Sequence, residues 1–223
     1  MSKADRCLKA LYQLYELGEP PTTTTIVATW LGIRPSSATE MFHRLVERGY
    51  VRYHPYHGVE FTPDGWRRAA EVVRHHRLIE LYLYQGLDYP LESVHAEAER
   101  LQSAISGELG ECIARLLGEP VYAPQGDPIP DRDETAPLLF TVSLTLHPLG
   151  CAVVVRRVRD MDSAVLGELV CCRLLPQQRC WLCGCESSRS ACLVAVGGEV
   201  VQLSGVAVQA VAVEPCGDRD AER

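Results

Sequence analysis

Residues 32–45 read Gly-Ile-Arg-Pro-Ser-Ser-Ala-Thr-Glu-Met-Phe-His-Arg-Leu, and this stretch decides the fold. Gly32 ends a short helix for which the threonines at 22–25 offer N-caps. After a tight turn, Ser37 and Glu40 have the spacing of a capping box ahead of a new apolar run. Two helices joined by a short turn that contains glycine predict a helix-turn-helix.

The flanking segments complete a winged head. Before the helix-turn-helix, apolar residues recur at helical spacing over residues 8–15, and Gly18 ends this first helix. Behind it, residues 50–53 and 59–61 flank the sequence His-Pro-Tyr-His-Gly, which predicts a short β-hairpin. A hairpin directly after a helix-turn-helix is a wing, so residues 1–63 are predicted to form a winged helix-turn-helix DNA-binding domain.

The rest of the chain divides by its pattern of residues. Residues 64–119 show helical periodicity in three segments, whereas residues 120–137 are rich in proline and predict a linker. Short Val- and Leu-rich runs separated by glycine predict a small β-barrel over residues 138–216, with one run at 206–213, and residues 217–223 form a tail. We therefore expect a multi-domain α+β protein.

Composition and charge limit the functional classes. The chain contains no run of about 18 uncharged apolar residues, and its N-terminus lacks the apolar core of an export signal. We therefore expect a cytoplasmic protein without membrane segments. The net charge of -7 hides a split, because residues 1–74 carry +2 and the remainder carries -9. A locally basic head on an acidic protein is compatible with DNA binding.

Several stretches resemble the diphtheria toxin repressor and manganese transport regulator family, and they occur in the family's order. They are residues 34–41, 58–65, 74–80, 94–99 and 126–130. The predicted β-barrel at residues 138–216 is similar to the SH3-like domain that longer members share with the ferrous iron transport protein A family, through residues 166–169 and 174–176.

The resemblance implies the function as well as the architecture. It implies a winged head, a helical dimerisation domain and an SH3-like β-barrel in a homodimeric repressor of manganese or iron homeostasis. Such a regulator responds to a divalent metal and binds double-stranded operator DNA, which a symmetric dimer reads as a palindrome. It is not an enzyme.

The recognition helix supplies the candidate DNA contacts, because its first turns reach base edges in the major groove. These candidates are Arg34, Ser36, Ser37, Thr39 and Glu40. The resemblance implies that the positions of Arg34, Ser36 and Glu40 approach bases. Further candidates, for phosphate contacts, are Arg44, Arg48, Arg52 and His57. The alternative is that these arginines are a solvated helix face.

Two pairs of residues predict a metal site. His76 and Glu80 are four residues apart on one predicted helix, and His95 and Glu99 have the same spacing on the next. Each pair lies on one helix face, and the two faces can converge. Two imidazoles and two carboxylates suit Mn, Fe, Co, Ni or Zn better than Ca or Mg. The alternative is that both are ordinary solvated pairs.

The resemblance implies a further, primary metal site whose ligand positions have changed here. Arg6 and Lys9 stand at the positions on the first helix, and Gln102 and Ser103 stand one turn beyond Glu99. Neither an ammonium nor a guanidinium can ligate a cation. We therefore expect this site to be lost, with Arg6 replacing the metal by pairing with Glu99. The resemblance also implies extra ligands from the C-terminal domain, for which the candidates are Asp160 and Asp162.

Cysteines are concentrated late in the chain, with six between residues 171 and 192. A thiol site built from Cys180, Cys183, Cys185 and Cys192 is an alternative sensor, of redox state or of a second metal or cluster, in a regulator of the same fold. If residues 179–185 form a strand, Cys183 and Cys185 share a face opposite Cys180, which hinders one four-thiolate site. Small buried residues without chemistry are the other interpretation.

Two other functions are considered. A hydrolase would use the two histidines and two carboxylates to activate water, yet no nucleophile or general base stands out near them. A dimer that only buffers metal would keep the ligands without binding DNA, and salt-dependent binding to its own promoter would exclude it.

Overall fold

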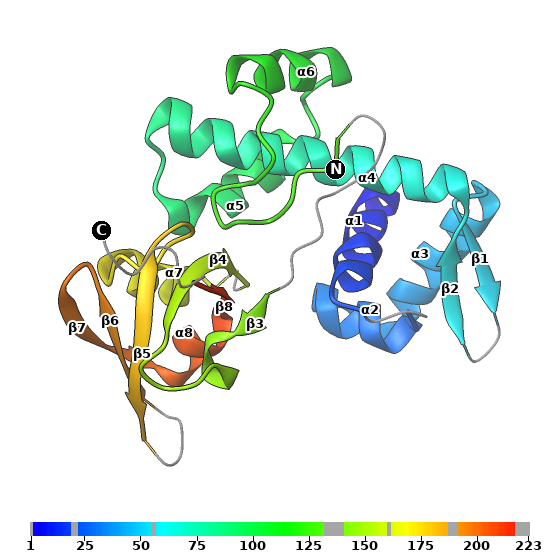
Figure 1. The fold of residues 1–223 in the computed structure, drawn as a ribbon. Coiled ribbons are helices and arrows are strands. Elements are labelled where there is room, and N and C mark those ends of the chain that lie inside the picture. Colours follow the sequence, from blue (N-terminus) through cyan, green and yellow to red (C-terminus); the bar gives the residue numbers. More distant parts are fainter. Residues whose placement is uncertain are drawn as a thin grey trace. The chain divides into compact units, whose positions relative to one another are not determined.

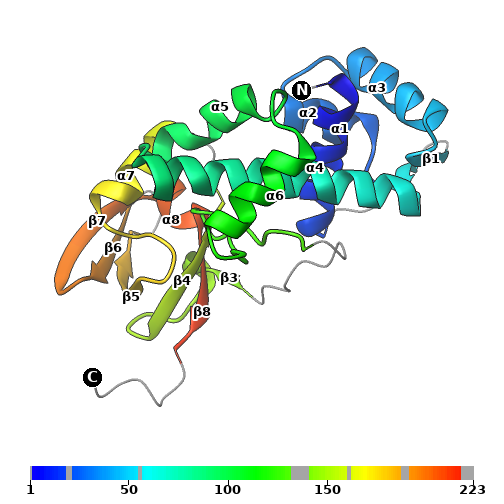
Figure 2. The ribbon, with the colours of Figure 1, turned by 90° about the horizontal axis from the view of Figure 1, so that it is seen from above.

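A computed structural model of the chain describes residues 2–18, 22–54, 57–131, 141–159, 162–186 and 191–216. The chain forms two compact units. The first contains the N-terminal head with most of the long helix behind it, and the second contains the C-terminal sheet. Figures 1 and 2 show the elements of each unit from two directions.

The head has the predicted winged helix-turn-helix. Its elements are α1 (Lys3–Glu16), α2 (Thr24–Leu31), α3 (Pro35–Glu47) and an antiparallel hairpin of β1 (Val51–His54) and β2 (Gly58–Phe61). Thr23 caps α2 as expected, through its hydroxyl and the backbone N–H of Ile26. The predicted capping box in α3 was wrong, because the helix begins at Pro35, with Arg34 as its N-cap and no side-chain cap. Proline at the first helical position fixes φ and lacks an N–H, so it starts the helix before Ser37.

Apolar packing fixes the three helices of the head and the start of the next helix. Leu8, Phe42 and Leu45 are fully buried in one cluster with residues of the wing. The rings of Tyr12 and Trp66 lie 4.9 Å apart between their centroids, which joins α1 to the helix that follows the wing. Helix α1 therefore packs in one core with the recognition helix, the wing and the start of α4.

Helices follow the head as predicted. They are α4 (Pro63–Leu81), a π-helical turn (Tyr82–Gly86), α5 (Leu91–Leu101) and α6 (Gly107–Leu116). Thr62 begins α4 by accepting a hydrogen bond from the N–H of Gly65 at 3.1 Å. The described part of the proline-rich segment, residues 120–131, contains no helix or strand. Much of this segment is buried, so it is packed against other parts of the protein and is not an exposed linker.

The C-terminal unit is an antiparallel sheet with the strand order β3-β8-β4-β5-β6-β7. Its strands are β3 (Val142–Ser143), β4 (Ala152–Val158), β5 (Arg179–Cys185), β6 (Ala191–Val196), β7 (Glu199–Ser204) and β8 (Val211–Pro215). Helices α7 (Ser163–Cys171) and α8 (Gly205–Ala210) accompany it, with a short 3-10 turn at Leu144–Leu146. Among the described residues the edge strands β3 and β7 do not pair, so the sheet is open and is only loosely a barrel.

One segment of this unit that was predicted to be a strand is a helix. Residues 206–210 were expected as part of a strand but lie in α8, and only the residues from Val211 onward are extended. Ser204 caps this helix through the N–H of Ala207, and Ala207 and Val208 are fully buried in the core. Packing and a cap thus override the β-propensity of valine.

Candidate nucleic-acid interface and metal centre

The start of α3 presents a polar face to solvent. Ala38, Met41 and Phe42 are buried against the head, which turns the opposite side of the helix outward. The exposed residues of that side are Arg34, Ser36, Thr39, Glu40 and Arg44, while Ser37 is half-buried. Glu40 and Arg44 form an ion pair of 2.6 Å one turn apart on this face. Four of the five residues expected to read bases are thus accessible to a ligand.

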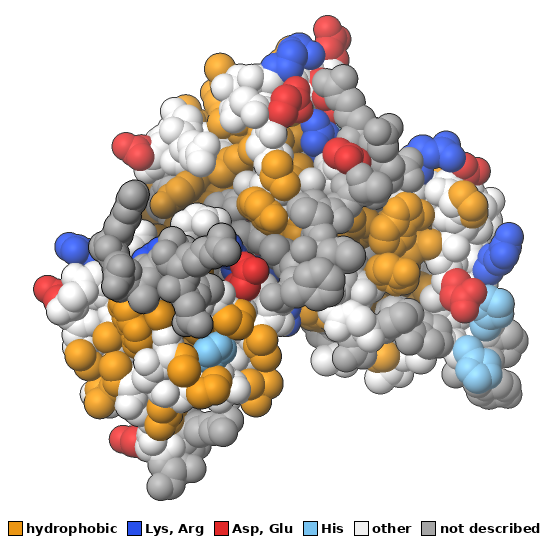
Figure 3. All heavy atoms as spheres, viewed as in Figure 1, with side chains coloured by type: hydrophobic (Ala, Val, Ile, Leu, Met, Phe, Trp, Pro, Cys, Tyr) orange, Lys and Arg blue, Asp and Glu red, His pale blue; other side chains and the backbone are white. Residues whose placement is uncertain are grey.

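The wing follows α3 directly and carries further polar groups. Arg52 on β1 and His57 in the turn are exposed, and His54 lies 3.3 Å from Glu60 across the hairpin. Figure 3 shows histidine side chains at this hairpin. Arg48 is exposed at the end of α3. The residues expected to meet phosphates therefore lie on the surface of α3 and the wing.

The structure gathers the predicted metal ligands on α4 and α5. One ligand atom from each of His76, His95 and Glu99 lies within 4.8 Å of the other two. Glu80 has a different position, because its Oε1 lies 2.8 Å from Nδ1 of His95. With the ring proton on Nδ1, His95 donates to Glu80 and keeps its Nε2 lone pair for a ligand. Glu80 thus orients His95.

A lysine from α1 lies within the same group of side chains. The ammonium of Lys9 forms an ion pair with Glu99 and lies 3.2 Å from Nε2 of His76. Nδ1 of His76 lies 3.1 Å from Oε1 of Gln102, whose amide nitrogen donates to Glu99 at 2.9 Å. Four side chains, those of Lys9 on α1, His76 on α4, Glu99 on α5 and Gln102 just after α5, are therefore linked in a closed ring of hydrogen bonds, which we call the Lys9 ring.

The expectation that Arg6 pairs with Glu99 was wrong. Arg6 is exposed and donates to the backbone carbonyl of Leu31 at 3.3 Å, whereas Lys9 is only 6% exposed. Helix α1 is buried on most of its surface, so Lys9 is carried inward with its neighbours. Residues 7–11 read Cys-Leu-Lys-Ala-Leu, and a single lysine inside an apolar run is the sequence signal for this buried cation. Ser103 is exposed and its hydroxyl bonds to the carbonyl of Arg100.

The donor set fits a divalent transition metal, but Lys9 competes for it. Two imidazoles and a carboxylate are suitable ligands. An ammonium, however, is a donor only, and it contacts two of the three candidate ligands, His76 and Glu99. A metal that used the same atoms must displace this ammonium.

The extra ligands expected from the C-terminal domain find no support. Asp162 is the N-cap of α7, where its carboxylate accepts the N–H of Ala164 at 2.8 Å. Asp160 lies outside the described residues.

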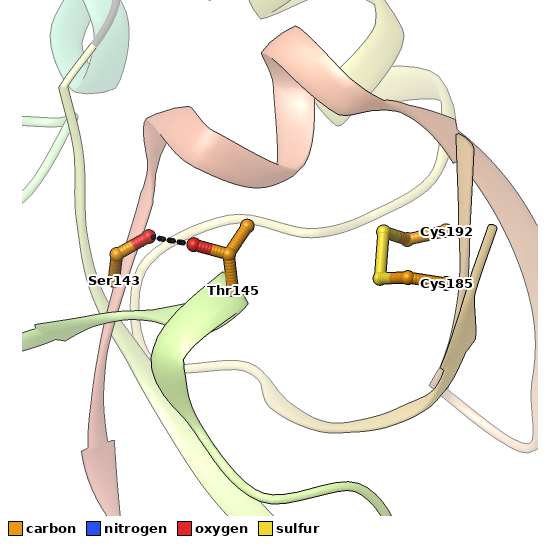
Figure 4. The surroundings of a disulfide bond; sticks show 4 residues. All are labelled: Ser143, Thr145, Cys185 and Cys192. Atoms are coloured by element: carbon orange, nitrogen blue, oxygen red, sulfur yellow. Dashed lines mark hydrogen bonds between the residues drawn. A yellow bond between two sulfur atoms is a disulfide. The ribbon is translucent and has the colours of Figure 1, made fainter. Parts of the chain in front are cut away.

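The structure separates the four cysteines of the expected thiol site. Cys185 and Cys192 are opposed across β5 and β6 and form a disulfide (Figure 4). Cys180 is fully buried in the sheet core, and burial raises the pKa of its thiol to about 12. Cys183 is exposed. Four thiolates around one metal are therefore not formed.

The expected faces of β5 also need correction. The register of β5 against β6 shifts between Leu182 and Gly184. This irregularity breaks the strict alternation of a strand, so Cys183 is exposed while Cys185 packs against the core. Cys183 and Cys185 do not share a face.

A winged helix-turn-helix followed by helices that gather histidines and carboxylates defines a class, that of metal-binding regulators of transcription. The comparisons with known proteins agree. Residues 1–59 match the model for the "Iron dependent repressor, N-terminal DNA binding domain", and residues 62–131 match that for its "metal binding and dimerisation domain". The chain belongs to the iron-dependent repressor family of metal-dependent transcriptional repressors, which includes the diphtheria toxin repressor. The family consists of DNA-binding regulators and not enzymes.

Individual relatives show the same likeness. The chain is 32% identical to the iron-dependent repressor IdeR of Mycobacterium leprae over 162 residues, which cover 69% of this chain and 70% of that protein. It is 31% identical to a solved "Manganese-dependent transcriptional repressor complex with manganese", with a TM-score of 0.86 over 96% of this chain and all of the other. The zinc-bound structure of ScaR is 26% identical, with a TM-score of 0.77 over 96% of this chain and 99% of that one. Among the described residues, no helix has the length and apolar character to span a membrane.

Proposed function

We propose that this protein is a homodimeric repressor that binds palindromic operator DNA through α3 and the wing and responds to a divalent transition metal. The observation that carries the proposal is the exposed first turn of α3, which Pro35 starts abruptly and which the buried residues Ala38 and Phe42 hold outward. A helix with this exposure directly before a wing is suited to the major groove. We also infer that the protein acts in the cytoplasm, where operator DNA is found.

The residues divide by the kind of contact they are suited to make. Arg34 and Ser36, at the start of α3, are placed for base edges, and an arginine there suits a guanine. Arg48 and Arg52 are suited to phosphates, which supply affinity and register. Arg44 is held by Glu40 and must exchange this ion pair to contact DNA.

The metal site of the proposal is built on α4 and α5. His76, His95 and Glu99 are the proposed ligands, and Glu80 fixes the ring of His95. A metal held by these residues would supply the positive charge that joins the carboxylate of Glu99 to the two imidazoles. This donor set accepts Mn, Fe, Co, Ni or Zn, and competition by Lys9 sets the affinity.

An apolar stripe supports the assignment of the dimer to the helical region. Leu109, Cys112 and Leu116 recur at helical spacing along α6 and are all exposed, Leu116 to 71%. Exposed leucines on one helix face indicate a protein interface. Leu116→Asp is expected to shift the protein from dimer to monomer in light-scattering chromatography.

The test is DNA binding by the full-length protein. Fluorescence anisotropy with a fragment of its own promoter should show nanomolar affinity that falls steeply with added salt. Arg34→Ala should weaken specific binding by about 1–3 kcal/mol. Arg67→Ala is the matched control, because this exposed arginine of α4 is paired with Asp64 outside α3 and the wing. Equal loss in both variants, or no sequence preference in the parent, would contradict the proposal.

A second candidate keeps DNA binding but makes the cysteines the sensor, and the disulfide between Cys185 and Cys192 favours it. Disulfides in cytoplasmic proteins are usually redox-sensing, because glutathione and thioredoxin keep thiols reduced. Metal analysis and DNA binding of protein purified without oxygen, with and without Cys183→Ser and Cys185→Ser, separate the two candidates. A metal response that survives both substitutions excludes the cysteine sensor.

A further inference from the structure

Lys9 is the residue whose position the proposed function does not explain. It comes from α1, yet its ammonium lies among side chains of α4 and α5, where it pairs with Glu99 and contacts His76. A charged group this deeply buried is costly unless paired and hydrogen-bonded. Neighbouring side chains therefore accept the hydrogen bonds of the Lys9 ammonium.

The donors and acceptors of the Lys9 ring are consistent with only one arrangement of protons. An ammonium only donates, so Nε2 of His76 must accept from Lys9. The ring proton is then on Nδ1, which donates to Oε1 of Gln102. The amide of Gln102 donates in turn to Glu99, which also accepts from Lys9. The ring closes with a net charge of zero and without any added ion.

The Lys9 ring links three helices. Lys9 belongs to α1, His76 to α4 and Glu99 to α5, while Gln102 directly follows the last residue of α5. Because α1 packs in one core with α2 and α3, a tie that holds α1 also holds the DNA-binding head. The candidate metal ligands His76, His95 and Glu99 come from α4 and α5 alone, so within the Lys9 ring it is Lys9 that connects α1 to these helices.

We propose that Lys9 is a tethered cation that joins α1 to α4 and α5 in place of a metal, so that the metal-free protein keeps its head in the DNA-binding arrangement. The inference rests on the proposed function and concerns its regulation. A metal at His76 and Glu99 would compete with Lys9 for these two side chains, and the head is held without it. The metal response of the proposed function is therefore small, at most about threefold in DNA affinity, and Lys9 lowers the affinity for the metal itself.

The experiment compares four proteins under the same conditions: the natural chain, Lys9→Met, Lys9→Glu and the control Arg6→Met. Lys9→Met removes the charge and keeps the aliphatic stem, and Lys9→Glu replaces the cation by a possible ligand. Arg6→Met removes an exposed charge from the same helix outside the Lys9 ring. Promoter affinity is measured in EDTA and then with Mn²⁺ or Zn²⁺, and metal affinity is measured by calorimetry without DNA.

The natural chain and Arg6→Met should bind the promoter within about threefold of the same affinity in EDTA and in metal. Lys9→Met should lose tenfold or more in EDTA and bind metal at least tenfold more tightly than the natural chain. Lys9→Glu should lose DNA binding in EDTA and recover it with metal. Circular dichroism confirms that each variant is folded.

Two results overturn the inference: a natural chain that loses tenfold or more of its DNA affinity in EDTA, or a folded Lys9→Met that matches it in both measurements. The first result needs no variant, so it decides the question even if Lys9→Met fails to fold. Absence of DNA binding under every condition refutes the proposed function instead. The calorimetry then still tests Lys9, since unchanged metal affinity in both Lys9 variants contradicts competition.

Discussion

The helices around Lys9 and the cysteine-rich sheet both contain candidate metal ligands, but the fold brings them together only around Lys9. On α4 and α5, histidines and carboxylates one turn apart meet each other and a lysine, and each has polar partners. In the C-terminal unit, six cysteines lie within a short stretch, yet they divide into a disulfide, a buried thiol, a half-buried thiol and two exposed thiols. A site thus depends on what the neighbouring elements bring to it, and residue type alone does not define one.

The largest effect that tests this comparison is in thiol reactivity. Burial raises the pKa of Cys180 from 9.0 to about 12, and the thiolate is the form that reacts. A higher pKa lowers the thiolate fraction at pH 8, here by a factor of roughly 1000. Cys183 is exposed and should therefore react with iodoacetamide far faster than Cys180, as peptide mass spectrometry can follow. Similar rates in the native protein would mean that the sheet core is open.

The reactivity difference has an internal control in the head. Cys7 is also fully buried, with a pKa raised to about 12 by burial, while Cys112 on α6 is exposed. The same contrast is expected between these two thiols. In denaturant all four should react at similar rates, because the burial that raises the pKa is lost.

The second effect is in the stability of the first unit. Glu99→Leu removes the carboxylate that pairs with Lys9, whose side chain is 7% exposed against 32% for Glu99. Removing one partner of such a pair leaves a buried charge and should cost about 3 kcal/mol, the lower end for buried pairs because Glu99 reaches solvent. Chemical denaturation measures this loss.

A double substitution separates the charge from the packing. Lys9→Met with Glu99→Leu removes both charges and should recover most of the loss, to within about 1 kcal/mol of the natural chain. A double variant as unstable as Glu99→Leu would show that shape, and not charge, is what Lys9 supplies.

The sequence predicted the head well because its signals are local. The N-cap Thr23 and the turn at Gly32 act within a few residues, and the structure bears out the helix-turn-helix, although α3 begins at Pro35 and not at the expected capping box. Helical spacing predicted that His76 and Glu80 share one helix face and that His95 and Glu99 share another. Their convergence with a residue of α1 did not follow from spacing, because spacing within one helix says nothing about which turn of a distant helix lies opposite.

The errors have the same origin. Arg6 and Lys9 are both cations of α1, so residue type does not show which of them pairs with Glu99. The packing of α1 shows that Lys9 is the one that faces inward. The strand expected through Val206 became a helix because a serine cap and burial outweighed its valines. The alternation of Cys183 and Cys185 failed at a register shift that depends on the partner strand. Burial or pairing against distant segments contributed to each outcome, and at α8 the local cap by Ser204 did so as well.

The third effect belongs to the sheet. The disulfide between Cys185 and Cys192 spans seven positions in sequence, and closing so short a loop should stabilise the fold by about 2 kcal/mol. Cys185→Ser should therefore lower the melting temperature of the C-terminal unit, and a reducing agent should lower that of the natural chain by as much. Cys183→Ser is the control and should change nothing. A natural chain insensitive to reducing agent would show that the two thiols stay unpaired in solution.

The smallest expected effect concerns the Lys9 ring. It tests whether the hydrogen bonds of Gln102 add stability beyond that of the ion pair between Lys9 and Glu99. Gln102→Leu removes the acceptor of His76 and a donor to Glu99, and loss of these hydrogen bonds should cost about 1 kcal/mol, since Gln102 is partly exposed and water replaces it in part. In a protein of this size that corresponds to about 2–4 °C in melting temperature. Ser103→Ala, one residue further on, removes a hydroxyl that bonds only to the carbonyl of Arg100 among the described contacts, so its effect should be near zero. If the two substitutions lower the melting temperature equally, Gln102 adds no stability to that of the ion pair between Lys9 and Glu99. A larger loss of melting temperature for Gln102→Leu means that the amide orients His76 for Lys9. The site then depends on an uncharged neighbour as well as on its charged residues.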